Sequence, residues 1–116
     1  MEIRLEDYNF YIRAGRSDMR KSSVGLALIV QEDMGLRPFE KSVFLFCGSN
    51  RRTIKAIVWN GNGWLEIIKR LECGSSFKWP TTADEALRIK VEDLLLLLKG
   101  YDIWRQFPVY TPQLVG

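Results

Sequence analysis

The feature that most constrains the fold is a change to a two-residue hydrophobic period in the middle of the chain. The segments SVFLFC (42–47), TIKAIVW (53–59) and WLEIIKRL (64–71) are rich in aromatic and β-branched residues, which favour β-strands. The sequence GSNRR (48–52) joins the first pair, and NGNG (60–63) joins the second. Asn-Gly pairs accept the positive φ angles of a tight hairpin turn. These residues therefore predict three sequential strands of an antiparallel β-meander.

A strand and a helix are predicted before the meander. The sequence YNFYIR favours a short strand over 8–13, which Gly15 ends. Ser17 is a good N-cap, Asp18 suits the positive end of the helix dipole, and Gly35 can close the helix. One apolar stripe at helical spacing is expected to face the core, and it consists of Met19, Ser23, Leu26, Ala27, Val30 and Met34.

After the meander, a short strand is predicted over 77–79 and a leucine-rich helix before Gly100. The predicted apolar face of this helix consists of Val91, Leu94, Leu95 and Leu98. Leu96 and Leu97 lie off that face. The helix is therefore either buried on more than one side or presents leucines to a partner.

These elements predict an α+β fold, with an antiparallel β-meander sheet packed by two main helices. A chain of 116 residues with 47% apolar content can fill a single core. We expect one domain over residues 1–105 and a tail over 106–116 that is irregular or docked on the surface. No apolar run approaches the roughly 18 residues of a membrane span. The N-terminus lacks an export signal, so a cytoplasmic protein is expected.

Reactive groups are scarce in this composition. There is no histidine, which removes the commonest general base and the commonest metal ligand. The two cysteines, Cys47 and Cys73, cannot form a structural zinc site by themselves. Cys47 lies in an apolar strand with no histidine to activate it, so a buried, inert thiol is expected. We therefore expect no enzymatic activity, no cofactor and no metal.

Cationic residues gather near the predicted start of the first helix, although the net charge of the chain is only +3. Arg16, Arg20 and Lys21 surround a helix N-terminus, where free N–H groups and the helix dipole suit a phosphate. The alternative is that Ser17 and Asp18 simply cap the helix and satisfy its amides themselves.

A second group of cations lies on the predicted hairpin. Arg51 and Arg52 occupy its loop, where long cations reach phosphates easily. Lys55 and Trp59 are expected on the outer face of the strand that follows, where they would resemble the stacking platform of a single-strand binder. The alternative is that the tryptophans pack under a helix and the cations keep a sheet edge soluble.

The next strand carries Trp64, Lys69 and Arg70, and neither of its faces is cleanly polar. Its register and the side that faces the core are therefore left open by the pattern.

An ordered set of residues matches a known family. It consists of Asp18-Met19-Arg20-Lys21 after a glycine turn, Phe46, Lys55, Trp59, Gly61, Gly63, Lys69-Arg70-Leu71, Gly74, Phe77, Trp79-Pro80, a leucine-rich helix before Gly100, and Trp104. Over residues 10–105 the chain resembles the small TnpB-type accessory protein, encoded by the second open reading frame, of the insertion-sequence-66 family of bacterial transposons.

The resemblance implies a role in the transposition of a mobile element, alongside a separate transposase and a further small accessory protein. It assigns no role to single residues. Contact with DNA through the cations is a hypothesis that comes from their charge, and it covers Arg16, Arg20, Lys21, Arg51, Arg52, Lys55, Lys69 and Arg70.

Two functions stay open at this point. In the first, a non-enzymatic accessory of transposition contacts DNA, the transposase or both through a basic face. In the second, the chain is a protein-interaction module, either an adaptor or a homo-oligomer, that never contacts nucleic acid. The residues expected at that partner interface are Trp59, Trp64, Leu96 and Leu97.

Overall fold

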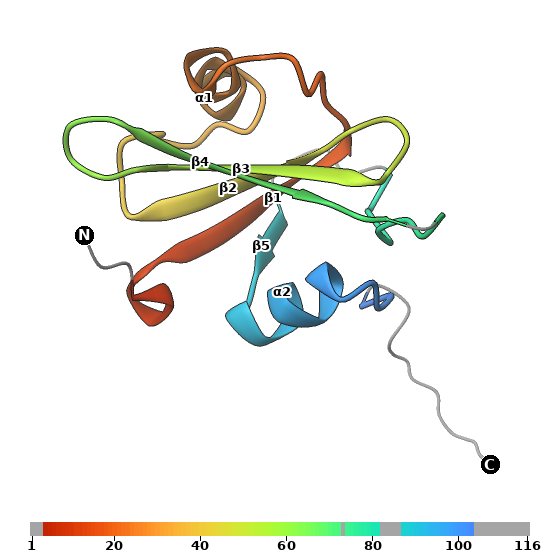
Figure 1. The fold of residues 1–116 in the computed structure, drawn as a ribbon. Helices are drawn as coiled ribbons and strands as arrows, with labels where there is room; N and C mark the ends of the chain where they lie inside the picture. Colours follow the sequence, from red (N-terminus) through yellow and green to blue (C-terminus); the bar gives the residue numbers. More distant parts are fainter. Residues whose placement is uncertain (1–3, 73, 82–86, 104–116) are drawn as a thin grey trace.

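The computed structural model describes residues 4–72, 74–81 and 87–103, whose arrangement is shown in Figure 1. The elements are η1 (Leu5–Asp7), β1 (Asn9–Arg16), α1 (Ser23–Glu32), β2 (Ser42–Cys47), β3 (Thr53–Trp59), β4 (Trp64–Arg70), β5 (Leu87–Ile89) and α2 (Val91–Leu98). The predicted meander is β2–β3–β4, and its strand bounds agree with the hydrophobic period to within one residue. The predicted tail over 106–116 and the domain boundary at 105 lie outside the described residues.

The strands form one five-stranded sheet in the order β4-β3-β2-β1-β5. Each neighbouring pair is antiparallel except β1 and β2, which run parallel. Parallel neighbours need a crossover connection, and α1 supplies it between β1 and β2. The predicted α+β class with two helices is confirmed, and the sheet is mixed rather than purely antiparallel.

α1 covers one face of the sheet (Figure 1). The cluster on this face consists of Leu26, Ala27, Val30, Met34, Phe44, Phe46 and Ile57. Three residues of the predicted stripe, Leu26, Ala27 and Val30, are the buried residues of α1. Met34 is buried just after the helix, whereas Met19 lies before its start. Every residue of β2 is buried, because helices lie over both of its faces, and this explains its uninterrupted apolar sequence.

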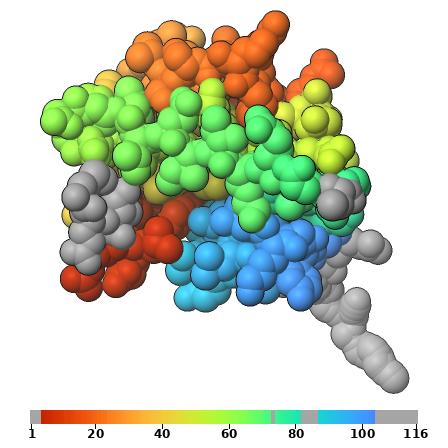
Figure 2. All heavy atoms as spheres, viewed as in Figure 1, coloured from red at the N-terminus to blue at the C-terminus, as the bar shows by residue number. Residues whose placement is uncertain are grey.

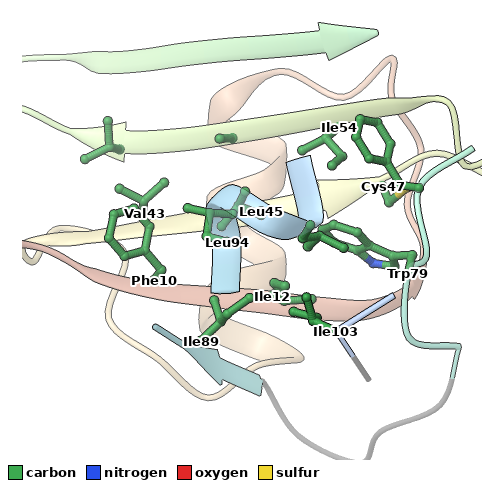
Figure 3. Packing of buried hydrophobic residues seen from close by; sticks show 14 residues of the cluster. Phe10, Ile12, Val43, Leu45, Cys47, Ile54, Trp79, Ile89, Leu94 and Ile103 are labelled. Atoms are coloured by element: carbon green, nitrogen blue, oxygen red, sulfur yellow. The ribbon is translucent and has the colours of Figure 1, made fainter. Parts of the chain in front are cut away.

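α2 covers the opposite face together with the segment around Trp79 (Figure 3). Leu94 and Leu97 of α2 are in the same cluster as Val43 and Leu45 of the sheet. The Trp79 Nε1–H group donates a hydrogen bond of 2.9 Å to the carbonyl oxygen of Arg13 in β1. This bond fixes the segment after the meander to the sheet.

The predicted start of the first helix is wrong. α1 begins at Ser23, and the Ser22 hydroxyl caps it by accepting a 3.3 Å bond from the Gly25 N–H. The Ser17 N–H group instead donates to the carbonyl oxygen of Cys47 over 2.8 Å. This bond continues the contact between the first two strands and holds Ser17 outside the helix.

The predicted strand over 77–79 is also wrong. Its Phe77 N–H donates to the Arg51 carbonyl oxygen over 2.6 Å, but the segment has no place in the ladder of strands. The fifth strand is Leu87–Ile89, a short edge strand that pairs with β1 and that the sequence pattern did not reveal.

The predicted faces of the leucine-rich helix are partly wrong. Leu97 was expected off the apolar face, yet it is fully buried, whereas Leu95 is 48% exposed. α2 docks through Leu94 and Leu97, which are three residues apart and so lie on one side of the helix. A run of five leucines has no periodicity of its own, so the sequence did not indicate which side faces inward.

Candidate nucleic-acid interface

One end of the sheet gathers strand ends that carry cations. β1 and β2 are parallel and finish together, with Arg16 opposite Cys47. β3 begins and β4 finishes at the same end, where Thr53 lies opposite Arg70. We call this the basic end and define it by Arg16, Arg20, Lys21, Arg51, Arg52, Lys69 and Arg70. The parallel β1–β2 pair thus brings the cations of residues 16–21 beside those of the hairpin.

A cleft of about 680 Å³ lies between the segment after β1 and the β2–β3 loop. Its lining includes Arg16 and Arg20 on one side and Asn50 and Thr53 on the other. A neighbouring hollow of about 340 Å³ shares Arg16 and is also lined by Arg51. Three arginines from two distant segments therefore border adjoining hollows.

The backbone of the β2–β3 loop is held by its own hydrogen bonds. The Arg51 N–H donates to Gly48 O over 3.0 Å, and the Gly48 N–H donates to Thr53 O over 3.0 Å. The Arg52 N–H donates to Asn50 Oδ1 over 2.9 Å. Arg51 has a φ of 59°, which is in the left-handed region. The two arginine side chains therefore extend from a fixed turn.

Lys55 does not lie on an exposed outer face as predicted. The residue is only 6% exposed, because α1 and the segment before it cover this face of β3. Its Nζ donates to the carbonyl oxygens of Met19 over 3.1 Å and Lys21 over 2.7 Å, and it lies 3.7 Å from Glu66 Oε1. Lys55 therefore ties the segment that carries Arg20 and Lys21 to the sheet.

Asp18, the acid next to these cations, forms a bidentate ion pair with Arg20. Arg20 Nε and Nη2 each donate over 3.0 Å to an oxygen of Asp18, and the Arg20 backbone N–H adds a bond of 2.9 Å. These bonds lower the pKa of Asp18 to about 2. Asp18 is therefore ionised at neutral pH and offsets the charge of Arg20, although the Arg20 side chain is 91% exposed.

The other end of the β3–β4 hairpin is aromatic. Trp59 lies opposite Trp64 in the register, and their ring centroids are 5.2 Å apart in an edge-to-face arrangement. Phe39 from the α1–β2 connection completes the group, with centroids 5.0 Å from Trp59 and 5.5 Å from Trp64. We call these three residues the aromatic end. Both tryptophans are half-buried, and Phe39 is 60% exposed.

Phe39 was missed in the sequence, where its only signal is an aromatic residue after Pro38 in a connection. Of the two leucines predicted at a partner interface, Leu96 is exposed and Leu97 is fully buried. The residues predicted for partner contact therefore do not form one surface, because the tryptophans lie at the hairpin turn and the leucines on α2.

The described residues offer little for bond-making chemistry. Cys47 is buried, as predicted, and burial raises the pKa of its thiol to about 11, which leaves almost no thiolate at neutral pH. Within the described ranges, His, Cys, Asp and Glu form no group of three that could hold a metal ion. In the same part of the chain, no helix has the length and apolarity that crossing a bilayer requires.

A comparison with protein families decides the relationship. The sequence model of the family described as "IS66 Orf2 like protein" matches residues 8–107. The chain belongs to this family. Membership implies an accessory role in transposition of an insertion sequence. The members of this family are not known as enzymes.

Two relatives of this IS66 Orf2-like chain come from Sinorhizobium fredii, and both are described as uncharacterized proteins. One, y4hO, is 36% identical over 111 residues, which cover 96% of each chain. The other, y4jC, is 31% identical over 101 residues, which cover 85% of this chain and 86% of the relative. No solved structure matches the chain.

Proposed function

We propose that the protein is a non-enzymatic accessory of transposition that contacts the DNA backbone through its basic end. Its partners would be the element's DNA, the transposase and a further accessory protein of the same element. The bond-breaking chemistry would belong to the transposase, and the role of this chain would be to position DNA.

The observation that carries this proposal is the meeting of cations from three separate segments at one end of the sheet. Arg16 ends β1, Arg51 is in the β2–β3 loop, and Arg70 ends β4. Contacts with phosphate groups supply most non-specific affinity for DNA, and they need clustered cations more than a particular sequence motif. Arginine side chains suit this role because their planar fork matches two phosphate oxygens.

The ion pair between Arg20 and Asp18 is compatible with DNA binding, because a phosphate group can replace the Asp18 carboxylate. Exposed ion pairs are weak in water, and the Arg20 side chain is almost fully exposed. A DNA phosphate can therefore replace the carboxylate at little cost. Lys55 is not among the proposed contacts, because its ammonium group is enclosed and already donates to Met19 and Lys21.

The test is a mobility-shift titration of the protein against duplex DNA at several salt concentrations. The variant replaces Arg20, Lys21, Arg51 and Arg52 with alanine. The slope of log K against log salt concentration should become less steep by about 3–4, since each lost phosphate contact contributes about 0.9 to that slope. The matched control removes four exposed cations elsewhere, namely Arg4, Arg37, Lys41 and Arg88. Equal loss of affinity in variant and control would refute a dedicated basic end.

A second candidate function is docking of the transposase or the other accessory protein on the aromatic end. The exposed ring of Phe39 against two half-buried tryptophans favours it, since aromatic residues are enriched at protein interfaces. Co-purification with the transposase that survives nuclease and high salt, and that Phe39→Ala removes, would support this function. A complex that is unaffected by Phe39→Ala, or that nuclease removes, would exclude it.

A further inference from the structure

We propose that the protein forms a symmetric dimer in which the β4 strands of two copies pair antiparallel, edge to edge. β4 is one of the two edge strands of the five-stranded sheet and the longer of them, and residues Glu66 to Arg70 are all exposed. Figure 2 shows the green surface of the β3–β4 region uncovered across one side of the molecule. A long strand of this kind without proline is an open template for pairing.

The backbone of β4 has a defined set of outward-facing groups. At the two limits of the hairpin, the Asn60 N–H donates to Gly63 O, and the Leu71 N–H donates to Arg52 O. Because hydrogen-bonded pairs alternate along antiparallel strands, the odd-numbered residues of β4 bond to β3. The N–H and C=O groups of Glu66, Ile68 and Arg70 therefore face the free edge.

The side chains at these positions indicate that the occupant is a second copy of this chain. Glu66, Ile68 and Arg70 are two residues apart, so they share one face of β4. A two-fold axis through Ile68 places Glu66 opposite the partner's Arg70, and Ile68 opposite the partner's Ile68. The strand thus carries an acid and a base at equal distances on either side of an apolar centre, an arrangement that favours antiparallel self-pairing.

The other face of the strand accepts the same register. Leu65 would lie opposite the partner's Leu71, and Ile67 opposite the partner's Lys69. Ile67 and Ile68, now 52% and 51% exposed, would both be covered in part by the partner strand. A register centred on Ile67 would instead place Glu66 opposite an isoleucine and form no ion pair. Charge complementarity therefore selects Ile68 as the centre.

Glu66 has the capacity for this additional contact. It accepts a bond of 2.8 Å from the Ser23 hydroxyl and lies 3.7 Å from Lys55 Nζ, and both contacts use Oε1. Oε2 makes neither contact, and it can therefore accept from a guanidinium group. Because the two strands are antiparallel, the basic ends of the two copies would point in opposite directions. The dimer does not depend on DNA contact, so each proposal can fail without the other.

The first test is the mass of the DNA-free protein in solution, measured by light scattering during size exclusion. We expect about 27 kDa for the wild type, twice the 13.5 kDa of the chain. We expect about 13.5 kDa for Ile68→Lys, because this substitution places two lysines opposite each other at the two-fold axis. The control is Leu28→Lys on the outer side of α1, where the leucine is 50% exposed. It should stay dimeric. A monomeric wild type, or the same mass for both variants, would overturn the proposal.

The second test does not depend on disrupting the strand. In a background with Cys73→Ser, Ile68→Cys should form an inter-chain disulfide under mild oxidation. In the proposed register the two Ile68 residues form a hydrogen-bonded antiparallel pair. The Cα atoms of such a pair are about 5.5 Å apart, within the range of a disulfide. Ile67→Cys should cross-link far less, because it faces the partner's Lys69. Equal cross-linking at both positions, or none at Ile68, would overturn the proposed register.

Discussion

The two ends of the β3–β4 hairpin differ in how their side chains are held. At the aromatic end, Phe39, Trp59 and Trp64 contact one another, and the tryptophans are half-buried. At the basic end the backbone is fixed, whereas the charged groups extend into solvent, as the 91% exposure of the Arg20 side chain illustrates. Changes at the aromatic end should therefore act on folding and leave the affinity for DNA unchanged, and changes at the basic end should act on the affinity for DNA.

The largest effect is expected where the basic end is attached to the core. Lys55→Met should lower the free energy of unfolding by about 2–4 kcal/mol, since it leaves two carbonyl groups and Glu66 without their buried cation. Denaturant titration measures this change. Lys41→Met, at an exposed position just before β2, is the matched control and should stay within about 0.5 kcal/mol of wild type. Equal stability of the two variants would contradict the role assigned to Lys55.

At the aromatic end, Trp59→Ala should cost about 2 kcal/mol of stability, because a half-buried ring and its contact with Trp64 are lost. The affinity for DNA should not change, measured where the variant is still folded. Loss of DNA affinity in this variant would break the proposed separation of the two ends.

Stability should also fall at high pH because of Cys47. The pKa of this thiol is raised to about 11 from an ordinary value of 9.0, so the unfolded state ionises first as the pH rises. The contribution of the protonated Cys47 thiol to the free energy of unfolding is fully present below about pH 9. It falls by roughly 2–3 kcal/mol as the pH rises to about 11. The measurement is the difference in unfolding free energy between wild type and Cys47→Ala at each pH. A difference that is constant from pH 8 to 11 would contradict the buried thiol.

The smallest effect is expected from the acid that pairs with Arg20. Asp18→Asn should raise the affinity for DNA by about two- to fivefold at low salt, since it frees a cation and removes a negative charge near the phosphates. The gain should shrink as salt is added. Unchanged affinity at low salt would mean that Arg20 does not contact DNA.

Much of the fold could be predicted because its signals are local. The aromatic and β-branched content of β2, β3 and β4 and the Asn-Gly turn between the last two predict these strands, and neither signal depends on distant residues. The parallel β1–β2 pair and the start of α1 could not be read in this way. Both Ser17 and Ser22 suit an N-cap, and a hydrogen bond from Ser17 to the distant Cys47 selects the second.

The candidate site was predicted in its composition more than in its geometry. The cations of the hairpin loop and of residues 16–21 were identified by charge, but their closeness results from the parallel pair. Lys55 was misplaced because a lysine between apolar neighbours is usually an exposed alternate position. Its burial depends on carbonyl groups of Met19 and Lys21, which lie more than thirty residues away in the sequence.

The central claim is that binding belongs to the basic end and can be removed without unfolding the protein. The most direct measurement is DNA affinity against salt for the fourfold alanine variant of Arg20, Lys21, Arg51 and Arg52, with its unfolding free energy measured on the same sample. The account predicts a salt slope lower by about 3–4 and a stability within about 1 kcal/mol of wild type. Wild-type affinity and salt slope in this folded variant would contradict it.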